Sequence, residues 1–166
     1  MYVTHDHALP ASADPLRLLR DREEVIDALY RFGYGQDLRD RDLFASAFAA
    51  DATLDFAPAA ARWGGESPLM SGRDAIVDTI LGLFAGRVDT THVVTNPRVR
   101  VDGDTASLTA IVEAQHLLSA DHSRYALLKN LYDADLVRDG DRWVLRRLRI
   151  DNVWYTGDPA VVFGPA

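Results

Sequence analysis

The hydrophobic positions near the start of the chain recur with the period of an α-helix. Pro15 suits the first turn of such a helix, because the N–H of a residue there has no partner within the helix. Asp21 and Glu24 have the spacing of a capping box, at which the helix continues or restarts. Spacings of four, three and four residues bring four positions onto one helical face: Ile26, Tyr30, Gly33 and Asp37. The carboxylate of Asp37 thus continues a hydrophobic stripe, which is unusual for a charged residue.

Shorter elements follow this helix. The pattern predicts a short helix over residues 43–48, a first strand over residues 52–57 and a loop over residues 58–72 that contains several glycines and prolines. A third helix is expected to begin near Ser71 and to end near Gly86.

The rest of the chain alternates hydrophobic and polar residues, as β-strands do. Four long strands are predicted, over residues 91–101, 105–118, 124–138 and 142–155. Tight turns at Asp102-Gly103 and Asp139-Gly140 would join neighbouring strands as hairpins. Pro97 interrupts the first of these strands, which predicts an edge position or a bulge, since proline has no N–H for the ladder. Helices that precede a run of antiparallel strands are typical of the α+β class.

The chain has 166 residues, a formal net charge of −7 and no cysteine. Its length suits one domain, which we predict over residues 14–166 after a flexible arm over residues 1–13. The lack of cysteine excludes disulfides and thiolate nucleophiles. The negative charge argues against nucleic acid as a partner, and no apolar run approaches the ~20 residues that cross a membrane. The arm lacks the basic start and apolar core of a signal peptide, so we expect a cytoplasmic protein.

Two histidines are expected to point into the interior of the sheet. Alternation within residues 91–101 places His92 and Val94 on one face. In the next strand the face that carries His116 otherwise holds small and apolar residues, so His116 is expected to point inward. Asp37 and these histidines form the one cluster of ionisable residues expected there. A carboxylate that bonds one ring nitrogen of a histidine stabilises the imidazolium, which suits proton transfer without a metal or cofactor.

Other interpretations remain open. An inward histidine is more often a hydrogen-bonded core residue than a catalyst, and Asp37 could bond a backbone N–H at the helix end. A metal site formed by Asp37, His92 and His116 is disfavoured, because no pair has a spacing such as H-x-x-x-H, and we predict neither metal nor cofactor. Trp63 and Trp154 could line a ligand pocket, or belong to the core or a dimer interface. The chain has no G-x-S-x-G, P-loop or G-x-G-x-x-G pattern, so hydrolase triads and nucleotides have no support.

Five segments carry a resemblance to a known family through their order and spacing. They are residues 24–37, 43–56, 71–76 (SGRDAI), 91–96 (THVVTN) and 139–143 (DGDRW). Together they resemble the SnoaL-like family of the nuclear transport factor 2-like superfamily, over about residues 20–157. The resemblance implies a cone-shaped (α+β barrel) fold, in which a curved antiparallel sheet wraps around a long N-terminal helix with two further helices. It also implies a homodimer through the sheet.

Site residues follow from the same resemblance. Relatives such as scytalone dehydratase, hexachlorocyclohexane dehydrochlorinase and bile acid 7α-dehydratase use an Asp–His pair in proton abstraction, which Asp37 and His92 match. The second histidine of scytalone dehydratase falls near His116. Three residues stand near the positions where those relatives carry assisting tyrosines and an inward arginine: Phe32, Phe56 and Leu148.

We therefore predict a cofactor-independent lyase or isomerase that acts on a hydrophobic small molecule, with His92 as general base and Asp37 as its partner. His116 or Tyr34 would hydrogen-bond a substrate oxygen. The residues expected to contact the substrate are Tyr34, Phe32, Phe56, Trp63, Val94, His116, Asn152 and Trp154. Two alternatives stay open: a polyketide-type aldol cyclase with the same pair, and a non-catalytic binding or assembly domain in which the pair is structural.

Overall fold

The structure is a computed structural model that describes residues 14–163, so the predicted arm over residues 1–13 lies outside the described residues. The helices are α1 (Pro15–Asp37), α2 (Arg41–Ala45), α3 (Ala57–Ala61), α4 (Arg73–Phe84) and α5 (Ala160–Phe163). The strands are β1 (Phe48–Asp55), β2 (Met70–Ser71), β3 (Val88–Asp102), β4 (Thr105–Leu118), β5 (Asp121–Asp139) and β6 (Arg142–Gly157).

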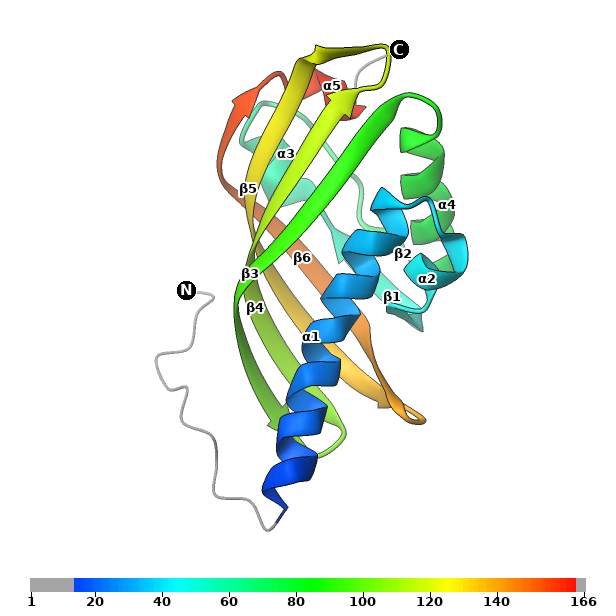
Figure 1. Ribbon diagram of the computed structural model, residues 1–166, viewed down its shortest axis with the longest axis vertical. Coiled ribbons are helices and arrows are strands. Elements are labelled where there is room, and N and C mark those ends of the chain that lie inside the picture. Colours follow the sequence, from blue (N-terminus) through cyan, green and yellow to red (C-terminus); the bar gives the residue numbers. More distant parts are fainter. Residues whose placement is uncertain (1–13, 164–166) are drawn as a thin grey trace.

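The strands form one strongly curved sheet in the order β2-β1-β6-β5-β4-β3, and α1 lies across its concave face with α2 and α4 beside it (Figure 1). The predicted α+β cone is thereby confirmed. The predicted antiparallel sheet is wrong in one detail, because β1 pairs with β6 in parallel. The described residues also form five helices, where the sequence predicted three. Hydrophobic alternation defines the faces of a strand but not the direction of its neighbour, so this pairing was not visible in the sequence.

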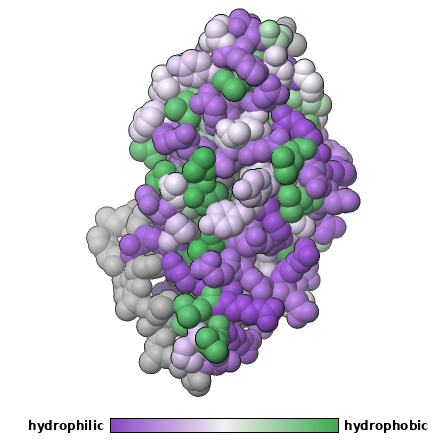
Figure 2. Space-filling model, viewed as in Figure 1, coloured by the Kyte–Doolittle hydropathy of each residue, from purple (hydrophilic) through white to green (hydrophobic). Residues whose placement is uncertain are grey.

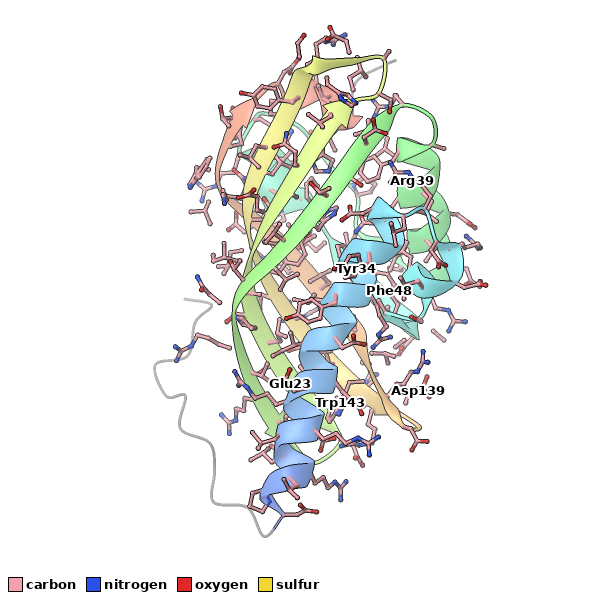
Figure 3. The ribbon with its side chains drawn as sticks, viewed as in Figure 1. Glu23, Tyr34, Arg39, Phe48, Asp139 and Trp143 are labelled. Carbon is pink, nitrogen blue, oxygen red and sulfur yellow. The ribbon has the colours of Figure 1, made fainter. Side chains whose placement is uncertain are left out.

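A local contact sets the start of α1, and contacts with a distant hairpin hold its first half. Asp14 caps its start by accepting a hydrogen bond from the backbone N–H of Arg17 at 3.0 Å. The helix continues without a break through Asp21, whose side chain does not cap it as the sequence suggested. Asp21 instead accepts a hydrogen bond from Nε1 of Trp143 at 3.2 Å and pairs with Arg138 at 2.8 Å. These contacts fasten the first half of α1 to the β5–β6 hairpin, where Figure 3 shows Trp143.

Several elements begin or end at other residues than predicted. The second helix ends at Ala45, and Phe48, predicted to be helical, begins β1. The loop predicted over residues 58–72 contains α3 and β2, and Pro58 in the first turn of an alanine-rich run is the local reason for α3. The last strand is followed by α5, which the pattern did not predict.

The edge strand β3 carries an irregularity at Pro97. Its pairing with β4 shifts register between Thr95 and Arg98, and Asn96 has a φ of 54°. Because β3 is the last strand in the sheet order, the predicted edge position and the predicted bulge are both confirmed. Residues before the bulge keep the alternation that turns His92 toward α1.

The core lies between the concave face of the sheet and the helices. Its largest fully buried side chains include Trp143, Phe44 and Phe48. Gly35 allows α2 to pack tightly against α1, since a Cβ there would lie 2.4 Å from the Cα of Phe44. Hydrophilic residues cover most of the face seen in Figure 2, with hydrophobic residues scattered among them. Within the described part of the chain, no helix combines the length and apolarity needed to cross a membrane.

Candidate active site

The last residue of α1 and a residue of β3 form a close acid–base pair. Asp37 Oδ1 lies 2.7 Å from Nδ1 of His92, and Oδ2 accepts a hydrogen bond from the backbone N–H of the same histidine at 2.7 Å. The hydroxyl of Thr90 donates a third hydrogen bond to Oδ1 at 2.9 Å. Gly33 permits this approach of helix and strand, because a Cβ there would lie 3.1 Å from the Cβ of His92. The structure thus brings the two predicted catalytic residues together.

The hydrogen bonds of Asp37 favour its ionised form. Burial alone would raise the pKa of this carboxyl, but its bonds with His92 and Thr90 outweigh burial and hold the pKa below its usual range. An ionised carboxylate only accepts, so Nδ1 of His92 carries the proton of the shared hydrogen bond. The other nitrogen, Nε2, then has a lone pair, and none of residues 14–163 hydrogen-bonds it. This arrangement leaves Nε2 able to accept a proton.

His116 has a different environment, although its ring centroid lies only 5.9 Å from that of His92. Burial, and then the nearby charge of His92, lowers the pKa of His116 to about 3. Its ring is therefore neutral at ordinary pH. Its Nδ1 is buried without a hydrogen-bond partner among the described residues, while the ring packs at 5.5 Å from that of Phe84. His116 points inward, as the alternation predicted, and offers one neutral polar group.

Both histidines line a cavity of about 260 Å³ between the sheet and α4. Its wall is mainly apolar, with Phe32 from α1, Phe56 after β1 and Phe84 at the end of α4. Further apolar wall residues are Leu54, Pro68, Met70, Ile80, Leu83, Ala114, Leu128, Ile150 and Val162. A small hydrophobic molecule would fit such a cavity beside the acid–base pair.

Of the residues predicted to contact substrate, Phe32, Phe56 and His116 line this cavity. Trp63 does not line it; its ring packs at 5.9 Å from that of Phe56. Asn152 lies buried behind the wall and donates a hydrogen bond from Nδ2 to Oδ1 of Asn130 at 2.9 Å.

The other three predicted contacts lie elsewhere. Tyr34 is 61% exposed on α1 (Figure 3) and, with Val94, lines a second pocket of about 230 Å³ between α1 and β3. Trp154 is half exposed on the outer face of the sheet, where Lys129 lies over its ring. Alternation from Asn152 would have turned Trp154 inward, but a register shift between β5 and β6 reverses the faces at this point.

Two lining residues of β5 were missed by the sequence reasoning, Asn130 and Tyr132. Their signal was of the same kind as that of His116 but weaker, because they are two polar members of an otherwise apolar face of the strand. Asn130 lines the cavity and uses its Oδ1 to accept from Asn152, so its amide N–H groups are the donors that it has left to offer. Burial, and then the charge of Asp37, raises the pKa of the Tyr132 phenol, so this hydroxyl stays protonated. Both side chains can therefore donate a hydrogen bond to a ligand.

The arginines of β6 lie outside the cavity. Arg147 pairs with Asp135 at 2.6 Å and Arg149 with Asp55 at 3.9 Å, as expected for the outer face, while Leu148 between them is fully buried. No inward arginine accompanies the pair from this strand. Within residues 14–163 no three or more His, Asp or Glu side chains are grouped so as to hold a metal ion.

Known proteins are similar to this chain in sequence or in fold. Residues 17–149 match the SnoaL-like domain. Terrestric acid biosynthesis cluster protein E of Penicillium crustosum is 33% identical over 161 residues, which cover 93% of this chain and 96% of that protein.

Two solved structures are similar at lower identity. A putative scytalone dehydratase from Novosphingobium aromaticivorans has a TM-score of 0.72 at 20% identity, over 84% of this chain and 89% of its own. A hexachlorocyclohexane dehydrochlorinase from Novosphingobium barchaimii has a TM-score of 0.71 at 21% identity, over 92% of this chain and 100% of its own. These likenesses agree with the cone described above. The chain belongs to the SnoaL-like domain family.

Proposed function

We propose that this protein is a cofactor-independent lyase or isomerase that moves a proton on a hydrophobic small molecule. The observation that carries the proposal is the hydrogen bond of 2.7 Å between Asp37 and His92 in the wall of an apolar cavity. A histidine with a free Nε2 and an ionised partner has the two features that a general base requires.

In the proposed reaction, Nε2 of His92 takes a proton from a carbon of the substrate. The electrons of the broken C–H bond form a double bond as an adjacent group leaves, or move into a neighbouring carbonyl. Asp37 stabilises the imidazolium, which then returns its proton to the leaving group or to another carbon, so that the enzyme ends in its starting state. The protonated Tyr132, with Asn130 and His116, would hold an oxygen of the substrate; Tyr34 lies outside this cavity.

The named relatives support eliminations as the reaction class. The two similar solved structures are named for a dehydratase and a dehydrochlorinase, which both remove a small group together with a proton. A second candidate, a polyketide-type cyclase with the same pair, is favoured by the relative that is named for a biosynthesis cluster. Removal of a proton from a carbon by His92 would be the first step of either reaction.

The experiment uses proton abstraction itself, so it does not require the natural substrate. Hydrophobic ketones and phenols are incubated with the protein in D₂O, and deuterium incorporation is followed by NMR. We expect exchange with the wild-type protein and a fall of at least ~100-fold in His92→Ala and Asp37→Asn, because general-base catalysis contributes about that much. The matched controls are His122→Ala and Asp89→Asn, which alter a second Asp–His pair. Its side chains lie 2.9 Å apart and are exposed to solvent.

Thermal unfolding of the same variants tests the non-catalytic alternative. If the pair is only structural, each single variant should lose ~3–5 kcal/mol of stability and the wild-type protein should catalyse no exchange with any probe. A doubly substituted variant that keeps wild-type exchange would rule out the proposed base.

A further inference from the structure

The carboxylate of Asp37 is connected to a cation that does not touch the histidine. Arg39, two residues after the end of α1, donates a hydrogen bond from Nη1 to Oγ1 of Thr90 at 3.2 Å. Thr90 in turn donates to Oδ1 of Asp37 at 2.9 Å. Thr90 is buried, so water does not compete freely for these bonds.

The direction of these hydrogen bonds is fixed by the chemistry of the groups. A guanidinium only donates and an ionised carboxylate only accepts. Between them the hydroxyl of Thr90 must accept from Arg39 and use its single proton for Asp37. The order of donation therefore runs from Arg39 through Thr90 to Asp37, which also receives the proton of Nδ1 of His92.

The backbone of Arg39 is held in an unfavourable conformation. Its φ is 58°, in the left-handed region that side chains with a Cβ rarely adopt. Glycine is the usual residue there, yet this chain has an arginine whose side chain also reaches the carbonyl oxygens of Gln36 and Val88. The guanidinium further lies 5.7 Å from the ring of Phe84, and Figure 3 shows Arg39 at the end of α1 close to α4. A strained backbone conformation of this kind persists only where surrounding contacts hold it in place.

From this geometry we propose that Arg39 is a positioning residue of the acid–base pair. It orients the hydroxyl of Thr90, and Thr90 keeps the carboxylate of Asp37 ionised and aimed at Nδ1 of His92. A catalytic role for Arg39 rests on the proposed function, in which the pair of Asp37 and His92 moves a proton. The other charged or titratable groups around Asp37 are His92 on β3, His116 on β4 and Tyr132 on β5.

The test reads the protonation of the pair and needs no substrate. Protein with ¹³C-labelled aspartate is titrated by NMR, and the ring ¹⁵N shifts of His92 report which nitrogen carries the proton. We expect Thr90→Val to raise the pKa of Asp37 by about 1, because a hydrogen bond that favours the charged form is lost. Thr90→Ser, which keeps the hydroxyl, should retain the wild-type titration and the wild-type ¹⁵N shifts.

Arg39→Met should raise the pKa of Asp37 in the same direction. Its matched control is Arg41→Met, which removes an equal charge from an exposed arginine that pairs with Asp78 instead. In the double variant Arg39→Met/Thr90→Val, the effect of Arg39→Met should fall to less than half of its size in the wild-type background, because the link is already broken.

Three outcomes would overturn the inference. One is a folded Thr90→Val variant with an unchanged Asp37 titration. Another is a change in the pKa of Asp37 that is as large in Arg41→Met as in Arg39→Met. The third is full additivity of the two pKa changes in the double variant. Either of these two results would mean that arginine acts on Asp37 only through its long-range charge. Failure here would leave the deuterium-exchange test of His92 untouched, and failure of that test would leave this titration unchanged, so the two proposals fail separately.

Discussion

His92 and His116 face each other across 5.9 Å, yet their surroundings give them opposite properties. His92 bonds an anion, so a proton taken up by its ring is compensated at once. His116 is buried beside Phe84, and Nδ1 has no partner among the described residues. Uptake of a proton by His116 would put an uncompensated charge in an apolar wall, so His116 serves better as a neutral hydrogen-bonding group.

The buried His116 should make the fold sensitive to acid. Its pKa is lowered from 6.5 to about 3 by burial, so below pH 6.5 the unfolded chain binds a proton that the folded chain does not. The free energy of unfolding is thus highest above pH 6.5 and should fall by up to ~1.4 kcal/mol per pH unit as the pH drops toward 3. Chemical denaturation at pH 6.5, 5.5 and 4.5 measures this slope.

The variant His116→Phe should flatten that slope, since it removes the group that titrates. His122→Gln serves as the control, because the side chain of His122 is exposed to solvent. An equally steep slope in His116→Phe and the wild-type protein would assign the acid sensitivity to other groups.

At the scale of elements, the packing of α1 against α2 depends on one missing side chain. A Cβ on Gly35 would lie 2.4 Å from the Cα of Phe44, and backbone at that distance cannot yield without a shift of the whole helix. We expect Gly35→Ala to destabilise the protein by about 3 kcal/mol through overpacking.

Gly82 of α4 offers the matched comparison. A Cβ there would meet nothing within 4 Å, and its backbone is helical. Gly82→Ala should therefore stabilise the protein by up to ~1 kcal/mol through helix propensity alone. Urea denaturation of both variants measures the difference; equal effects of the two substitutions would contradict the packing argument.

Local periodicity predicted most elements and brought Asp37, His92 and His116 into one cluster, from which the family resemblance selected Asp37 and His92 as the pair. The same alternation that turned His116 inward also applies to Asn130 and Tyr132, which were overlooked because a face with two polar residues is a weaker signal than one with a single histidine. Trp154 was misplaced for a physical reason: one extra residue in β6 reverses the faces of the strand, and no sequence pattern marks that position. The parallel direction of β1 depends on pairing with a strand about 95 residues away, which local patterns do not encode.

At the scale of the whole molecule, the convex side of the sheet carries the features of a contact surface. Glu113, Lys129 and Trp154 lie side by side on β4, β5 and β6, with Trp154 half exposed. Tryptophan is enriched at protein interfaces, and an exposed one is a candidate for the centre of such a contact. We expect a homodimer through this surface, as the family resemblance also implied.

Analytical ultracentrifugation tests this expectation with two variants. Trp154→Glu should dissociate the dimer, because it replaces a large aromatic side chain at the centre of the interface with a charged one. Leu16→Glu, which changes a more exposed hydrophobic residue at the start of α1, should leave it intact. A monomeric wild-type protein at micromolar concentration, or a dimeric Trp154→Glu variant, would argue against this interface.

The contact between Asp21 and Trp143 also constrains when the chain can fold. The two residues are separated by 122 positions, and Arg31 donates a hydrogen bond to the backbone carbonyl of Trp143 from 112 positions away. At ~5–20 residues per second, a ribosome adds Trp143 roughly 6–24 s after Asp21. During that interval the first half of α1 lacks the hairpin that it packs against, and its apolar side stays open to chaperones and to other nascent chains. The first half of α1 is thus anchored only when the β5–β6 hairpin emerges, whereas its last residue can already contact β3.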